Sequence, residues 1–217
     1  EHHMKLYLHP LSSYCQKAVT AFYEKNIPFE PQMLDGSAPV AGEFAALWPI
    51  GKFPFLLDGE RKVFEATGII EYLEAKFPAA PRLIPADPLA AAEARMWDRF
   101  FDNYVGYPQG RLVLAAIGRE ADDGGERWRT ALDTAYAILD ERMATRNWAA
   151  GDEFTIADCA AAPHLLYADW SHAIAATFPN LRAYRTRLLK RPSYARAFDE
   201  ARPYRHMFPL GAPEGRD

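Results

Sequence analysis

The sequence lacks the features of several large protein classes. Its longest apolar runs are much shorter than the roughly 20 residues that a membrane-spanning helix needs. The formal net charge is only −4, and no cluster of Lys and Arg occurs, so neither nucleic acid nor an anionic membrane is an expected partner. The histidines do not have metal-ligand spacing, and there is no glycine-rich phosphate loop. We therefore expect no metal and no permanently bound cofactor.

Cysteine is also scarce. The chain of 217 residues contains 2 cysteines, Cys15 and Cys159, far apart in the sequence. Two thiols in a chain of this length do not form a disulfide framework. Free thiols are typical of the reducing cytoplasm, so we expect a cytoplasmic protein.

Hydrophobic residues make up 49% of the chain, enough for a sizeable core, and their pattern divides the chain in two. Up to about residue 80, short strand-like and helix-like runs follow the order β-α-β-α-β-β-α, and Asp58-Gly59 indicates a hairpin. Prolines at 78, 81, 85 and 88 then interrupt the pattern, and only helical periodicity follows. The sequence predicts an α/β domain over residues 4–80, a linker over 81–88 and an all-α domain over 89–217. We expect a bend at Gly106-Tyr107-Pro108 in the first long helix of the second domain.

Three short motifs occur at defined places in this pattern. Ser12-Ser13-Tyr14-Cys15 lies between the first strand and the first helix, and Lys52-Phe53-Pro54 precedes the hairpin. Phe154-Thr155-Ile156-Ala157-Asp158 begins a later helix, where Thr155 and Asp158 form a variant capping box. Together, in this order, the motifs resemble those of the cytosolic glutathione S-transferase superfamily. The likeness covers nearly the whole chain.

The resemblance implies a glutathione transferase fold, with a thioredoxin-like N-terminal domain that binds glutathione and a C-terminal α-helical bundle that binds an electrophile. Glutathione is then a cosubstrate, and a homodimer is expected. Ser12 occupies the first position of a loop that carries C-x-x-C in thioredoxin-like redox proteins. The loop thus resembles that of serine-type members, theta- or zeta-like and bacterial in type.

The catalytic role that the resemblance implies falls on Ser12. We expect its hydroxyl to donate a hydrogen bond to the glutathione thiolate, next to a helix N-terminus with partial positive charge. Ser12 is alternatively a plain N-cap. Ser13 is one residue away and stays open as the group that faces the glutathione thiol. Cys15 stays open as a reactive thiol, since a thiol in a first helical turn can have a depressed pKa, or as a buried structural thiol.

Glutathione contacts are also implied by resemblance, and one of them departs from the family pattern. Lys52 is expected to bind the glycyl carboxylate, and Phe53 and Pro54 are expected to contact the cysteinyl part. We expect the peptide bond before Pro54 to be cis. The family has Glu-Ser at the γ-glutamyl end, where this chain has Glu65-Ala66 followed by Thr67. The Ala66 amide remains, and Thr67 is the nearest hydroxyl. A lost hydrogen bond to a charged group costs about 1.5–3 kcal/mol, so weaker glutathione binding is expected.

The second substrate is expected between the domains. The side chains that we assign to an electrophile pocket are Leu11, Tyr104, Tyr107, Arg111 and Tyr167. The leading function is transfer of glutathione to a small hydrophobic electrophile. Two alternatives stay open. One is a zeta-like glutathione-dependent isomerase or a glutathione-dependent reductase or peroxidase, and the other is a non-catalytic ligand- or protein-binding module.

Overall fold

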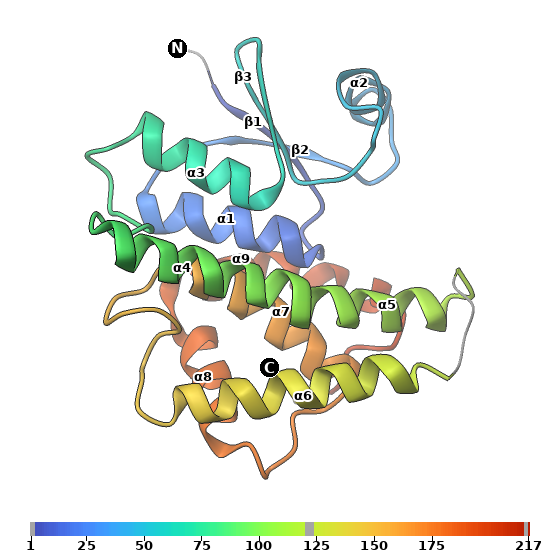
Figure 1. Ribbon diagram of the computed structural model, residues 1–217. Helices are drawn as coiled ribbons and strands as arrows, with labels where there is room; N and C mark the ends of the chain where they lie inside the picture. Colours follow the sequence, from blue (N-terminus) through green and yellow to red (C-terminus); the bar gives the residue numbers. More distant parts are fainter. Residues whose placement is uncertain (1–2, 120–123, 215–216) are drawn as a thin grey trace.

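The computed structural model describes residues 3–119, 124–214 and 217. A four-stranded sheet with its helices forms the N-terminal part, and a layer of helices lies beneath it (Figure 1). The N-terminal elements are β1 (Lys5–Leu8), α1 (Ser13–Lys25), β2 (Glu30–Met33), α2 (Val40–Leu47), β3 (Phe55–Asp58), β4 (Arg61–Phe64) and α3 (Ala66–Lys76). The predicted order of elements is confirmed.

The sheet has the strand order β2-β1-β3-β4, with β1 and β2 parallel and the other pairs antiparallel. Side chains alternate between its two faces, as the pleat requires. Leu6 and Leu8 join the main core with α1 and α3, whereas Tyr7 packs against Phe44 of α2 and Phe55 on the other face. The loop that follows β1, residues 9–12, lies next to the helical part of the molecule, where the ring of His9 packs edge-on against Tyr204.

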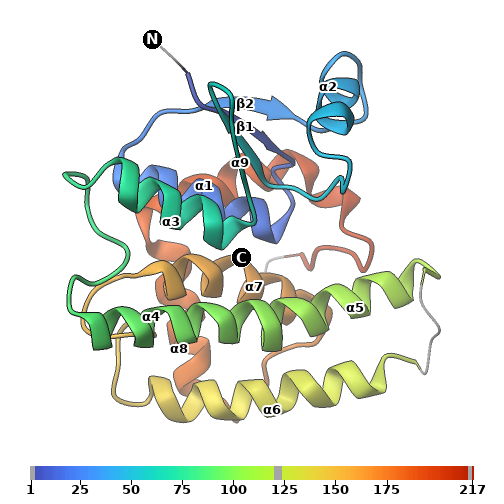
Figure 2. The same cartoon turned by 45° about the horizontal axis from the view of Figure 1, so that its top comes forward.

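The helical part consists of α4 (Pro88–Phe100), η1 (Phe101–Gly106), α5 (Tyr107–Ala116), α6 (Glu126–Met143), α7 (Ile156–Ser171), α8 (Pro179–Lys190), α9 (Pro192–Ala201) and η2 (Arg202–Met207). α7 lies at the centre of the helical part (Figure 2). Its residues from Ile156 to Trp170 are all buried. No helix in the described ranges is long and apolar enough to cross a membrane.

A π-helical segment, η1, lies where a bend was predicted. It connects α4 to α5 in one continuous helical run, and the Tyr107 N–H bonds to the Asp102 carbonyl instead of a carbonyl four residues back. The wider turn precedes Pro108, which stands in the first turn of α5 and has no N–H to leave unpaired. π-Helical turns are frequent at functional sites, and this one brings Asp102 to the domain boundary.

The capping box at the start of α7 is confirmed. Asp158 accepts hydrogen bonds from the Thr155 N–H at 2.9 Å and the Ala149 N–H at 2.9 Å, and the Thr155 side chain accepts from the Ala157 N–H at 3.2 Å. The Tyr184 hydroxyl donates a further hydrogen bond to Asp158. This buried cluster fixes the start of the central helix.

Candidate functional site

Two adjoining pockets lie between the sheet domain and the helices. The first, about 480 Å³ and here called the Glu65 pocket, is lined by Ser12, Tyr14, Trp48, Gly51, Lys52, Phe53, Pro54, Glu65, Ala66, Arg99, Asp102 and Asn103. The second, about 610 Å³ and here called the Arg111 pocket, has a lining that includes Leu11, Ser13, Tyr107, Arg111, Leu114, Tyr167 and Phe208. Both linings include Ser12, Tyr14, Lys52 and Phe53. A group at Ser12 is thus in reach of both pockets.

Ser12 is the N-cap of α1. It has extended backbone angles, and its Oγ accepts a hydrogen bond from the Cys15 N–H at 3.3 Å. That bond uses a lone pair of the hydroxyl and leaves its proton free to be donated. Capping and donation to a ligand are therefore compatible in one side chain. Ser13, the first residue of α1, lines only the Arg111 pocket.

Cys15 is placed differently from the serines. Its side chain is fully buried and lines neither pocket. Burial raises the pKa of the Cys15 thiol to about 12, although hydrogen bonds involving Ser12 and His9 oppose this rise. A neutral, enclosed thiol is a poor nucleophile.

The Phe53–Pro54 peptide bond is cis, as predicted. Both residues line the Glu65 pocket together with Lys52. On the opposite side, Glu65 has φ +65° and precedes α3, whose first turn has no side-chain cap. The N-terminal amides of α3, beginning with Ala66, are therefore available to an anionic ligand.

Thr67 is turned away from this pocket. Its hydroxyl accepts a hydrogen bond from Lys17 at 2.8 Å and donates one to Asp98 at 2.8 Å, and the side chain is not part of the pocket lining. The Thr67 hydroxyl, which was expected to replace the family's serine, thus forms its hydrogen bonds at the domain interface and not with a ligand in the pocket.

A buried ionic cluster lies beneath the Glu65 pocket. Lys17 lies 2.6 Å from Asp98 and 2.9 Å from Asp102, and the side chain of Lys17 is fully buried. Asp102 also bonds with His164 of α7 at 2.8 Å. Burial alone would raise the pKa of Asp102, but the hydrogen bond with His164 and the charge of Lys17 outweigh it and hold this pKa well below its usual range. The cluster couples α1, α4, η1 and α7.

Sequence reasoning missed the contribution of this helical run to the pocket. Arg99, Asp102 and Asn103 line it, and so does Tyr14, whose ring packs against His164 at a centroid distance of 4.7 Å. The one available signal was the spacing of Asp98 and Asp102, which places two carboxylates on one helix face. Only the packing of α1 against this face shows that Lys17 is their partner.

The residues expected around the electrophile divide into two groups. Leu11, Tyr107, Arg111 and Tyr167 line the Arg111 pocket. The Arg111 guanidinium lies over the ring of Tyr107, 5.4 Å from its centroid. Tyr104 lines neither pocket; it is 58% exposed, and its ring packs edge-on against Phe100.

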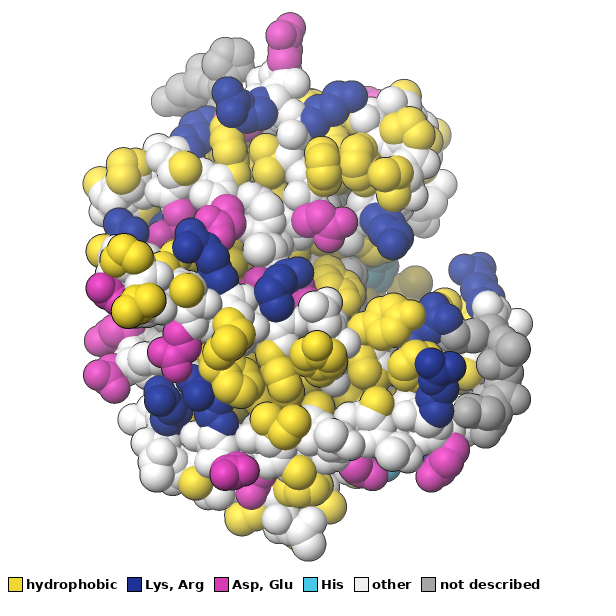
Figure 3. All heavy atoms as spheres, in the orientation of Figure 1, with side chains coloured by type: hydrophobic (Ala, Val, Ile, Leu, Met, Phe, Trp, Pro, Cys, Tyr) yellow, Lys and Arg dark blue, Asp and Glu magenta, His cyan; other side chains and the backbone are white. Residues whose placement is uncertain are grey.

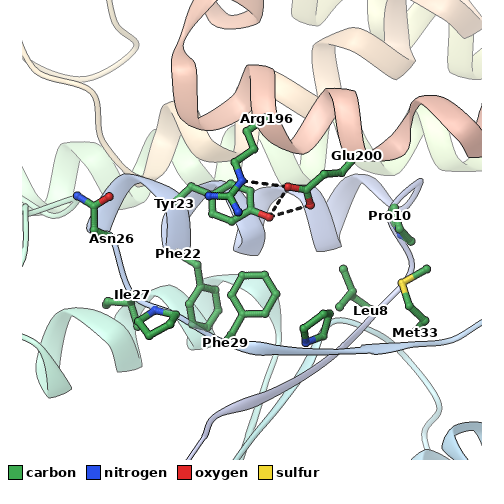
Figure 4. A pocket seen from close by; sticks show the side chains of 12 residues that line it. Leu8, Pro10, Phe22, Tyr23, Asn26, Ile27, Phe29, Met33, Arg196 and Glu200 are labelled. Carbon is green, nitrogen blue, oxygen red and sulfur yellow. Dashed lines mark hydrogen bonds and ion pairs between the residues drawn. The ribbon is translucent and has the colours of Figure 1, made fainter.

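A separate groove of about 820 Å³ lies between β2, α1 and α9 (Figure 4). Its floor is apolar and includes Leu8, Phe22 and Phe29. At its rim the Tyr23 hydroxyl donates to Glu200, and Arg196 both pairs with Glu200 and lies over the Tyr23 ring, so these polar groups satisfy one another. It shares no lining residue with the other two pockets.

Comparisons with known proteins agree with this architecture. Residues 6–81 match the glutathione S-transferase N-terminal domain family, and residues 122–187 match the corresponding C-terminal domain family. A glutathione S-transferase-like protein, LUC7 of Fusarium sp, is 31% identical over 73% of this chain and 74% of its own length. Glutathione S-transferase 3 of Zea mays is 28% identical over 88% of this chain and 91% of its own.

Among solved structures, glutathione S-transferase III in its apo form matches with a TM-score of 0.76 and 26% identity, covering 97% of this chain and 99% of that one. A Rhodospirillum rubrum glutathione S-transferase matches with a TM-score of 0.76 and 27% identity, covering 89% of this chain and 91% of that one. The chain therefore belongs to the glutathione S-transferase superfamily. The predicted fold, thioredoxin-like followed by all-helical, is confirmed, and so is the prediction of a glutathione transferase at the level of the family.

Proposed function

We propose that this protein transfers the glutathione thiolate to a small hydrophobic electrophile, and that it is a serine-type, theta- or zeta-like member of bacterial type. The observation that carries the proposal is the position of Ser12 where the two pockets meet. Glutathione occupies the Glu65 pocket, and the electrophile occupies the Arg111 pocket. Their reacting atoms then face each other beside the Ser12 hydroxyl.

Glutathione has charged groups at both ends, and the charges of the Glu65 pocket match them. Lys52 pairs with the glycyl carboxylate, and the cysteinyl part lies along Phe53 and Pro54. The γ-glutamyl end lies at Glu65 and Ala66, where the free amides of α3 face a carboxylate. This orientation leaves the thiol near Ser12, at the N-terminus of α1.

The chemical task is to keep the thiol ionised and positioned. With a thiol pKa of about 8.5, only about 3% is thiolate at pH 7, and lowering the pKa by about two units raises this fraction to about 75%. That shift requires about 2.7 kcal/mol of preferential thiolate stabilisation. Ser12 donates its O–H to the sulfur, and the first turn of α1 adds positive potential. The thiolate then attacks an electrophilic carbon, an S–C bond forms, and the displaced electron pair leaves with the leaving group or is protonated.

Ionisation explains only a small part of the rate, since a sulfur of lower pKa is also a weaker nucleophile. Most of the acceleration comes from holding sulfur and electrophile together, because effective molarities of positioned groups are large. The shared wall between the pockets provides this positioning. Leu11, Tyr107 and Tyr167 supply the apolar surface for the electrophile, with Arg111 at the pocket wall.

The experiment is a calorimetric titration with reduced glutathione, together with the ultraviolet absorbance of the bound thiolate as a function of pH. We expect Ser12→Ala to bind glutathione but to ionise its thiol about two pH units higher than the native protein does. Ser13→Ala is the matched control and keeps the native titration. An unchanged thiol titration in Ser12→Ala would remove Ser12 from this role. Absence of saturable binding at millimolar glutathione would favour a non-catalytic ligand- or protein-binding module instead.

Two features of the Glu65 pocket support this second candidate. Trp48 stacks against Phe55 and Phe64 and lines the pocket, and Ala66 lacks the family's serine hydroxyl. A relative that is 31% identical over 74% of this chain is named FtsZ-localized protein A, from Caulobacter vibrioides. The isomerase, reductase and peroxidase alternatives are tested by product analysis with glutathione present.

We also infer a homodimer. Hydrophobic side chains gather on the face shown in Figure 3, over both parts of the molecule. The large exposed apolar side chains include Ile50 at 64%, Phe64 at 46%, Leu89 at 83% and Met96 at 58%. Exposed apolar area of this kind marks a protein interface. Sedimentation equilibrium tests the dimer.

Three further expectations also stay predictions. They are a role in detoxification, the cytoplasmic location, and the division into domains at residues 4–80, 81–88 and 89–217.

A further inference from the structure

We propose that Arg99 binds the α-carboxylate of the γ-glutamyl group, and that it replaces the serine hydroxyl absent at Ala66. The inference rests on the proposed function, because it concerns the ligand of the Glu65 pocket. It assigns a binding role to a residue of the helical part of the molecule. Family motifs in the sheet domain gave no indication of this role.

The position of Arg99 is fixed by its contact with α3. Its guanidinium donates a hydrogen bond to the Thr67 hydroxyl, in the first turn of that helix, and its side chain lines the same pocket as Ala66. The first N–H groups of α3 have no acceptor within the helix, since the intrahelical bonds begin with Ile69 to Glu65. A carboxylate placed here meets backbone amides on one side and Arg99 on the other.

One edge of the Arg99 guanidinium is bonded to carboxylates, and the other edge is free to bind a ligand. Its Nε lies 3.1 Å from Asp98, and its Nη2 lies 2.8 Å from Asp98 and 2.5 Å from Asp102. Its Nη1 donates no hydrogen bond within the described ranges, and 47% of the side chain is exposed. The guanidinium therefore keeps donors for a ligand while the buried carboxylates fix its orientation. A fixed planar fork suits carboxylate recognition better than a mobile ammonium does.

The charges around Arg99 match an α-amino acid group. Within the cluster, Lys17 and Arg99 balance Asp98 and Asp102, so the cluster itself adds no net negative charge that would repel a ligand carboxylate. Asp102 and Glu65 also line the pocket, and the negative charge of Glu65 suits the ligand's α-ammonium. A free carboxylate and a free ammonium on one carbon distinguish the γ-glutamyl linkage from an ordinary peptide N-terminus. The site thus selects a γ-glutamyl thiol.

The test uses Arg99→Met and three peptides that differ only at this end. They are glutathione, glutaryl-Cys-Gly, which lacks the α-ammonium, and γ-aminobutyryl-Cys-Gly, which lacks the α-carboxylate. We expect Arg99→Met to weaken glutathione and glutaryl-Cys-Gly by about ten- to a hundred-fold, the effect of one hydrogen bond to a charged group. Binding of γ-aminobutyryl-Cys-Gly stays within about two-fold of the native value, since it has no carboxylate for Arg99 to bind.

Two control variants make the pattern specific. Lys52→Met should weaken all three peptides alike, because each keeps the glycyl carboxylate. Arg95→Met, one turn earlier on α4 in an exposed pair with Glu71, should leave all three unchanged. An equal loss for all three peptides in Arg99→Met, or no loss, overturns the inference while the proposed function stands. A native protein that binds none of them overturns the proposed function as well.

Discussion

The imidazole of His164 lies directly against Gly106, so that a Cβ at position 106 would be 2.7 Å from the ring. This approach occurs at the end of the π-helical segment η1, whose other end carries Asp102, the hydrogen-bond partner of His164. The glycine and the wider helical turn together let a histidine of α7 lie over the backbone. The buried cluster beneath the Glu65 pocket depends on this contact.

Replacement of Gly106 by alanine should therefore destabilise the protein. The ring of His164 is fully enclosed and cannot move away without breaking its bond to Asp102. Overpacking of this kind costs about 1–3 kcal/mol, measured as the change in the free energy of urea unfolding. Gly110→Ala, in α5, is the control, because the added Cβ meets nothing within 4 Å beyond the backbone of its own helix. It should stabilise by about 0.5–1 kcal/mol through helix propensity. Equal effects of the two substitutions would contradict the packing argument.

The pair of Lys17 with Asp98 and Asp102 should contribute far more than an exposed pair. Lys17→Met removes the fully buried cation from the carboxylates of Asp98 and Asp102, and breaking a buried pair costs about 3–5 kcal/mol. Arg95→Met removes the exposed pair with Glu71 and should cost at most about 1 kcal/mol. The measurement is again urea unfolding, with both variants at one pH. A small effect of Lys17→Met would mean that water or a ligand screens the cluster.

The same cluster predicts acid sensitivity. The pKa of Asp102 is depressed in the folded state, so its contribution to stability is fully present above the unfolded-state pKa of about 3.9 and is lost as the pH falls below it. Unfolding measured from neutral pH down to values well below this pKa should show a steep loss of stability in the native protein once the pH falls below it. Asp102→Asn should be less stable than the native protein at neutral pH, and its free energy of unfolding should depend less steeply on pH in the acid range. Parallel pH curves for the two proteins would assign the acid sensitivity to other carboxyl groups.

Local sequence signals predicted several elements of both parts of the molecule well because they act over short distances. Asp58-Gly59 gives the hairpin, Thr155 with Asp158 caps a helix, and the cis bond before Pro54 follows from a recognisable motif. The polar cluster could not be predicted in this way. Lys17 and Asp102 are 85 positions apart, and either one looks like a solvated residue on a helix surface. Their burial is a consequence of how α1 packs on α4 and η1, which no local pattern encodes.

The π-helical segment and the place of Thr67 were missed for a related reason. Periodicity does not distinguish an α-helical turn from the wider turn at Gly106, and the requirement for glycine arises only from His164 on a distant helix. Thr67 follows Ala66 in the motif, yet its hydroxyl bonds with Lys17 and Asp98 beneath the pocket. In the proposed binding site for the γ-glutamyl group, the chain thus differs from the family at Ala66, within the motif, and uses Arg99, which lies outside it.

The two cysteines give a last prediction, which separates serine-based from cysteine-based chemistry. Cys15 and Cys159 are both fully buried, and burial raises the pKa of each thiol, for Cys15 to about 12. Both should react with an aromatic disulfide only as fast as the protein opens, so labelling should accelerate sharply in urea near the unfolding midpoint. Cys15→Ala should therefore bind glutathione with native affinity. If Cys15 instead forms a mixed disulfide with oxidised glutathione in the native protein while Cys159 stays free, the nucleophile is Cys15 and Ser12 serves as its helix cap.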